Sequence, residues 1–83
     1  MDKSRIRWGC RRGLLELDIL LCGFFDAKYD ELSPELQADF VELLKEEDQD
    51  LQRWLVGQFV PEQEKIKNMV QIIRDYQKEN FTQ

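Results

Sequence analysis

Histidine is absent from this 83-residue chain, and cysteine, serine and threonine are scarce. Histidine is the side chain that most often acts as an acid–base group near neutral pH and the commonest metal ligand. The only hydroxyl nucleophiles among Ser and Thr are Ser4, Ser33 and Thr82. We therefore expect a protein that acts by binding, with no enzymatic activity, no catalytic residues and no metal site.

The two cysteines, Cys10 and Cys22, lie twelve residues apart and form no CxxC pair. Without histidine they cannot complete a zinc site of the usual kind. We expect both to be buried free thiols, as sparse cysteines in apolar stretches usually are. The charged start of the chain also lacks the apolar stretch of a secretory signal. Together these features predict a protein of the reducing cytoplasm.

Long apolar runs are missing too. The longest, Ile19 to Phe25, has seven residues, whereas a membrane-spanning helix needs about 20. We therefore expect no direct membrane insertion. The 42% hydrophobic content instead suits one compact core. The sequence predicts a single helical domain over residues 1–83, with residues 1–4 and 80–83 frayed.

Charge is distributed unevenly along the chain, whose net charge is −5. Residues 1–12 hold five basic side chains and one acidic one, whereas residues 26–50 hold ten acidic and two basic ones. A dipolar protein meets a partner in a preferred orientation. The acidic part repels phosphate, so we expect no nucleic-acid partner. An acidic helical module that blocks a basic protein remains an alternative.

Apolar residues recur at helical spacing throughout, and no stretch alternates as a strand does. The expected fold is all-α, a compact bundle of about five short helices. The first spans about residues 3–10, the second runs from Arg12 or Gly13 to about Tyr29, and residues 30–32 form a link. Ser33 and Pro34 are an N-cap and first residue of the third helix. Asp48 is expected to cap the fourth.

Gly57 is expected to end the fourth helix in a left-handed turn, and Pro61 to permit the last helix to start. The inward positions of these helices predict the core. In the second helix they are Leu14, Leu17, Leu21 and Phe24, widened by Leu15, Leu20 and Phe25; later helices add Leu36, Phe40, Leu43, Leu44, Leu51, Trp54, Leu55, Ile66, Met69, Val70, Ile73 and Tyr76.

Residues 7–18, RWGCRRGLLELD, break the local rules of helix design. On a helix, Arg12 and Glu16 would meet on one face beside Gly13, in the weaker order for an ion pair. Gly13 would cost such a helix up to about 1 kcal/mol relative to alanine. Two interpretations stay open: a surface ion pair with Trp8 in the core, or a binding patch with Trp8 as its anchor.

The stretch RGLLE, residues 12–16, resembles the RGxxE signature of the SdhE family of FAD assembly factors. The similarity extends through RRGLLELDILLCGFF and through the DxDLxxWLxG pattern of residues 48–57. It covers about residues 5–76. RGxxE alone is a weak signal, but the two patterns at this separation in a short helical chain are specific.

The resemblance implies a chaperone that binds the flavoprotein subunit of succinate dehydrogenase and promotes covalent attachment of FAD. It also implies the related flavoprotein of fumarate reductase as a second client. The FAD and the histidine that it joins belong to the client, so this chain needs no cofactor of its own. An alternative is that the chain binds FAD itself and delivers it. The implied partner-binding residues are Arg12, Gly13, Glu16, Trp8, Arg11, Arg7 and Asp18.

Overall fold

Five α-helices form the part of the chain that the computed structural model describes, residues 2–81. They are α1 (Lys3–Gly9), α2 (Leu15–Lys28), α3 (Pro34–Leu43), α4 (Asp48–Leu55) and α5 (Glu64–Phe81), with a short 3₁₀ turn, η1 (Tyr29–Glu31), after α2. No strand occurs within these residues. The all-α prediction of about five short helices is confirmed.

The first and last helices extend into the ends that we expect to fray, and the fraying itself stays a prediction. Asp2 caps α1 by accepting the Ser4 amide at 3.0 Å, so residues 3 and 4 are helical. Residues 80 and 81 belong to α5. Residues 1, 82 and 83, on which the rest of that expectation falls, lie outside the described residues.

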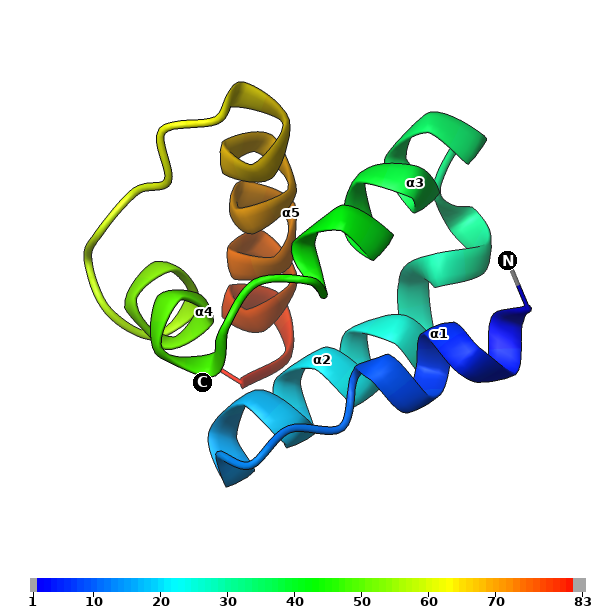
Figure 1. Ribbon diagram of the computed structural model, residues 1–83, viewed down its shortest axis with the longest axis horizontal. Helices are drawn as coiled ribbons and strands as arrows, with labels where there is room; N and C mark the ends of the chain where they lie inside the picture. Colours follow the sequence, from blue (N-terminus) through cyan, green and yellow to red (C-terminus); the bar gives the residue numbers. More distant parts are fainter. Residues whose placement is uncertain (1, 82–83) are drawn as a thin grey trace.

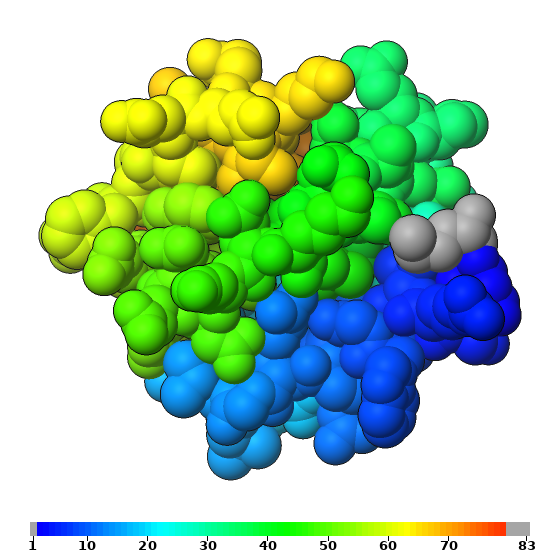
Figure 2. Space-filling model, in the orientation of Figure 1, coloured from blue at the N-terminus to red at the C-terminus, as the bar shows by residue number. Residues whose placement is uncertain are grey.

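The helices pack around α5, which contacts α2, α3 and α4. Helices α1 and α2 run side by side in opposite directions along one edge of the molecule (Figure 1). The space-filling view shows the N-terminal segment and the segment around the α3–α4 turn against one another on the same face (Figure 2). This junction positions the site described below.

The core follows the predicted apolar stripes. Leu17, Leu21 and Phe24 of α2 are buried, as is Phe40 of α3, and the Phe24 and Phe40 ring centroids lie 5.6 Å apart. The other fully buried core side chains come mainly from the C-terminal half of the chain: Leu43, Leu51, Leu55, Met69 and Ile73. The predicted core position Trp54 is only half-buried, although it packs against this cluster. No helix of the described chain is long and apolar enough to cross a bilayer.

The start of α3 is as predicted, because the Ser33 hydroxyl accepts the Leu36 amide at 3.2 Å and Pro34 is the first helical residue. The prediction for Asp48 is wrong: Glu47 holds the N-cap position of α4, and Asp48 is already helical. Its carboxylate is directed to another part of the chain.

Gly57 does end α4, but no glycine of the described chain has a positive φ, so the left-handed turn is wrong. The position requires glycine for space: a Cβ there would lie 2.8 Å from the Arg53 carbonyl oxygen. Helix α5 begins three residues after Pro61, at Glu64.

Candidate protein-binding site

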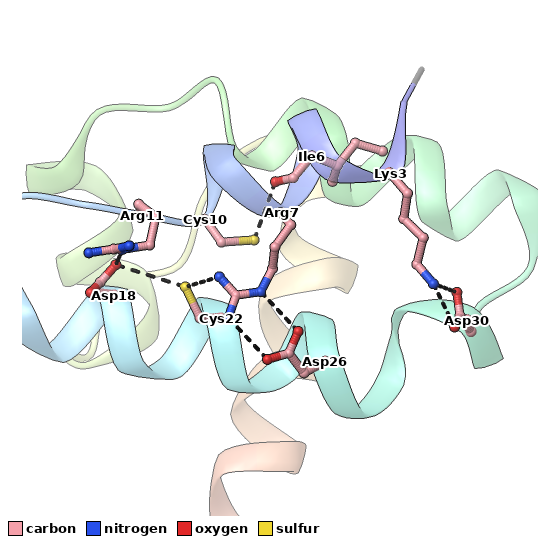
Figure 3. Close-up of polar contacts among 9 residues, drawn as sticks. All are labelled: Lys3, Ile6, Arg7, Cys10, Arg11, Asp18, Cys22, Asp26 and Asp30. Carbon is pink, nitrogen blue, oxygen red and sulfur yellow. Dashed lines mark hydrogen bonds and ion pairs between the residues drawn. The ribbon is translucent and has the colours of Figure 1, made fainter.

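Ion pairs join α1 and the segment after it to the next elements along the chain (Figure 3). Their N···O distances are 2.7 to 2.9 Å, and the pairs are Lys3–Asp30, Arg7–Asp26 and Arg11–Asp18. The excess of positive charge in the first twelve residues is therefore largely matched by acids of α2 and η1. The N-terminal segment is not a free basic arm.

Arg7 belongs to this row of ion pairs between the first eleven residues and residues 18–30, which we call the seam. Its guanidinium donates to both oxygens of Asp26, at 2.9 and 3.1 Å, and to the Cys22 sulfur at 3.1 Å. The hydrogen bond from Arg7 lowers the pKa of Asp26. Arg7 itself is half-buried.

Both cysteines are free thiols, as predicted. Cys10 is buried and its sulfur donates to the Ile6 carbonyl at 3.5 Å. Burial raises the pKa of this thiol to about 12. Cys22 is only half-buried, which differs from the prediction.

Arg12 precedes α2, because that helix begins only at Leu15. Its guanidinium reaches across to the α3–α4 turn, where it donates to the carbonyls of Leu44 and Glu46, the latter at 3.2 Å. It also pairs with Asp48 at 3.3 Å, and its side chain is only 13% exposed. The predicted Arg12–Glu16 pair on one helical face is therefore wrong, because Arg12 is not helical and its charge is used inside the fold.

Gly13 is exposed, and its amide donates to Asp48 Oδ2 at 3.2 Å. Its φ is not positive, and an added Cβ would meet only Asp48 Oδ2, at an ordinary 3.5 Å. Neither backbone conformation nor internal space therefore requires glycine here. The bare backbone at this position is available for a close approach from outside.

Asp18 faces the same segment from the opposite side. One of its oxygens accepts the Arg12 amide at 3.1 Å and Arg11 Nε at 2.9 Å. These hydrogen bonds, with the Arg12 amide contributing most, lower the pKa of Asp18. Asp18 thus holds the loop from within the fold, and the partner contact that the resemblance implies for it stays a prediction.

An aromatic and apolar surface surrounds the motif. Trp8 is 73% exposed, Leu15 72% and Ile19 53%. Leu15 and Ile19 lie one turn apart and so share a face of α2. The Arg11 guanidinium lies 5.9 Å from the Trp8 ring centroid. Trp8 is therefore not a core residue, and its role as the anchor of a binding patch stays a prediction.

Glu16 is exposed in the first turn of α2 and has no hydrogen-bond or ion-pair partner among residues 2–81. We define the motif surface by its exposed members: Trp8, Arg11, Gly13, Leu15, Glu16 and Ile19.

Leu15 and Ile19 were not predicted as site residues, and Leu15 was wrongly assigned to the core. Helix α2 is apolar over most of its circumference, so periodicity alone does not show which apolar side chains remain outside. The sequence did carry one signal of exposed apolar residues: α2 has more of them than a single buried face can hold.

The fold and the motif surface define a small helical-bundle protein with an exposed aromatic and apolar face around a charged motif, the pattern of a protein-binding module. Residues 4–77 match the family model Sdh5, flavinator of succinate dehydrogenase. The chain belongs to this family.

Relatives with the name FAD assembly factor SdhE match over most of their length. The chain is 45% identical to that of Colwellia psychrerythraea over 73 residues, which is 88% of this chain and 80% of the relative. It is 41% identical to that of Pectobacterium atrosepticum over 78 residues, which is 94% of this chain and 89% of the relative. The resemblance drawn from residues 12–16 and 48–57 is confirmed.

Proposed function

We propose that this chain is an assembly factor that binds the flavoprotein subunit of succinate dehydrogenase and promotes covalent attachment of FAD to it. Membership of the family supports the assembly role, and one structural observation supports the motif surface as the part that binds the client. Asp48 accepts hydrogen bonds from the Arg12 guanidinium and the Gly13 amide, yet Gly13 and Glu16 themselves are exposed. The fold itself needs neither a glycine at residue 13 nor the exposed Glu16 carboxylate, so we assign both to contact with a partner.

The proposed mechanism is positioning. The client supplies both the FAD and the histidine that becomes joined to the flavin 8α-methyl carbon. Docking of the motif surface holds mobile elements of the client so that histidine and flavin stay in reactive geometry. In this proposal the chain contributes no catalytic atom and acts as a chaperone.

Within the motif surface, the roles follow from exposure. Trp8, Leu15 and Ile19 supply apolar area that becomes buried on docking. Gly13 permits close backbone approach, and Glu16 offers an unpaired carboxylate to a donor of the client. Arg7, Arg12 and Asp18 act from behind this surface, since their polar groups are engaged within the chain.

Delivery of FAD by this chain has less support. A pyrophosphate would need free cations, but Arg7, Arg11 and Arg12 each pair with a carboxylate in the described chain. We therefore propose that the FAD stays with the client. The free thiols suit the reducing cytoplasm as the place of action.

The test is covalent flavin on the co-expressed flavoprotein subunit, read as fluorescence of the denatured protein band. Wild type and no factor are compared with Gly13→Leu and Leu15→Asp, the latter placing an acid in the first turn of α2, where the helix dipole favours it. Phe59→Asp is the matched control, because Phe59 is equally an exposed apolar residue but lies outside the motif surface. Circular dichroism checks that each variant is folded.

We expect flavin to fall to the no-factor level with the two motif-surface variants and to stay at the wild-type level with Phe59→Asp. Folded motif variants that work as well as wild type would remove the motif surface from the proposal. No gain from wild type with either the succinate dehydrogenase or the fumarate reductase subunit would remove the assembly role. Submicromolar flavin binding by the isolated chain would favour delivery. Loss of function on charge reversal within residues 26–50, without an effect at Gly13, would favour the acidic module.

A further inference from the structure

Asp48 lies 35 residues from Gly13 in sequence and contacts it directly. We infer that Asp48 is a positioning residue: together with Asp18, which accepts the Arg12 amide, it sets the conformation in which Gly13 is presented to the client. The part of this inference that concerns the client rests on the proposed function. The part that concerns the conformation of the loop rests only on the contacts of residues 11–14.

Two carboxylates from different helices hold the backbone of this loop. The Arg12 amide donates to Asp18 Oδ1 at 3.1 Å, and the Gly13 amide donates to Asp48 Oδ2 at 3.2 Å. Consecutive backbone amides thus depend on side chains of α2 and α4 rather than on a helix or turn of their own. Removing one carboxylate therefore leaves one of these two amides without its acceptor and loosens the loop at that residue.

Both oxygens of Asp48 have internal partners. While Oδ2 accepts the Gly13 amide, Oδ1 accepts the Arg12 guanidinium at 3.3 Å. The side chain is 32% exposed and does not hold the N-cap position of α4. Asp48 therefore serves the loop and is not itself offered to a partner.

The placement of Arg12, and with it the conformation of the loop, depends on the Asp48 carboxylate. Its Nε is buried and has no hydrogen-bond partner within the described chain, and Asp48 is its only carboxylate partner there. A half-buried guanidinium that loses its counter-charge gains by moving toward water. Such a movement would carry the adjoining Gly13 with it and change the motif surface without any change in its exposed side chains.

Asp50 provides a matched control. It lies in the same first turn of α4 as Asp48, so both carboxylates interact alike with the helix dipole. Within residues 2–81 its one ion pair is with Arg53 of the same helix, at 3.7 Å. Loss of Asp50 therefore changes charge and helix start as loss of Asp48 does, but leaves residues 11–14 untouched.

The experiment compares Asp48→Asn with Asp50→Asn in the full chain. Amide hydrogen exchange by NMR is followed at Gly13 and at Phe24, a fully buried core residue. Affinity for the purified flavoprotein subunit is measured by calorimetry. Asp48→Asn removes the charge and leaves one acceptor oxygen for two donors, the Arg12 guanidinium and the Gly13 amide. We therefore expect Gly13 exchange to rise and the affinity to fall, each by about tenfold or more, as when a hydrogen bond to a charged group is lost. Phe24 exchange should change less than Gly13 exchange, and Asp50→Asn should leave Gly13 exchange and affinity unchanged.

Two results would overturn the inference. One is a folded Asp48→Asn variant with wild-type Gly13 exchange, confirmed by the same result in Asp48→Ala. The other is equal acceleration at Gly13 and Phe24, which would assign Asp48 to global stability alone. If wild type itself fails to bind the flavoprotein subunit, the proposed function fails, whereas the exchange rates still decide whether Asp48 holds Gly13.

Discussion

Replacing Arg12 by methionine separates an internal role of the motif arginine from a direct partner contact. The substitution keeps an apolar stem of similar length in the loop and removes the guanidinium. It deletes the hydrogen bonds to the carbonyls of Leu44 and Glu46 and the ion pair with Asp48. These contacts connect the segment before α2 to the turn between α3 and α4.

The expected loss of stability follows from the burial of these groups. A hydrogen bond to a charged group contributes about 1.5–3 kcal/mol, and breaking a fully buried ion pair costs about 3–5 kcal/mol. Asp48 is one-third exposed and keeps the Gly13 amide, so the upper limits do not apply. We expect Arg12→Met to lower the free energy of unfolding by about 2–4 kcal/mol.

That loss is large for a chain of this size, whose total stability is on the order of 4–12 kcal/mol. The midpoint of thermal unfolding should fall by about 10–30 °C. The assay is urea and thermal unfolding followed by circular dichroism. Arg11→Met is the control, because Arg11 is exposed and its single ion pair with Asp18 should contribute no more than about 1 kcal/mol.

The reasoning is refuted if Arg12→Met stays within about 0.5 kcal/mol of wild type, the range of an ordinary surface substitution. Loss of flavinylation by such a stable variant would instead identify Arg12 as a direct contact to the client. A large loss of stability in Arg11→Met but not in Arg12→Met would reverse the roles assigned to the two arginines.

Two further predictions concern the helix end and the seam. Gly57→Ala should lower the free energy of unfolding by about 1–2 kcal/mol, because the added Cβ would lie 2.8 Å from the Arg53 carbonyl oxygen. Gly13→Ala should be nearly neutral, because the added Cβ would meet only Asp48 Oδ2 at an ordinary distance. Urea midpoints check both variants, and equal effects would contradict the claim that only Gly57 lacks room for a side chain. Arg7 lowers the pKa of Asp26 below its ordinary value of 3.8, so this carboxylate stabilises the fold above that pH and its contribution is lost as pH falls through the folded pKa. Unfolding curves from pH 6 to 2 should therefore show Asp26→Asn losing less stability than wild type on acidification, and parallel losses would contradict the linkage.

The sequence by itself determined the helices, the main core and the family. A serine and a proline at residues 33 and 34 start a helix through contacts within one turn, so a short stretch of sequence is enough to predict it. The stripe of Leu17, Leu21 and Phe24 identifies a buried face because helical periodicity is a local property. The RGxxE and DxDLxxWLxG patterns located the motif for the same reason: both are short stretches of sequence.

Only the tertiary structure decided what the motif residues do. Arg12 turns away from Glu16 because carbonyls and a carboxylate of the α3–α4 region, 32 to 36 residues away, accept its donors. A sequence pattern carries no distance between such segments, so it suggested a helical pair. Leu15 was wrongly placed in the core and Ile19 was not placed at all, because neighbouring helices cover only part of a helix that is apolar over most of its circumference. The packing of the bundle, rather than the type of residue, left these two side chains outside.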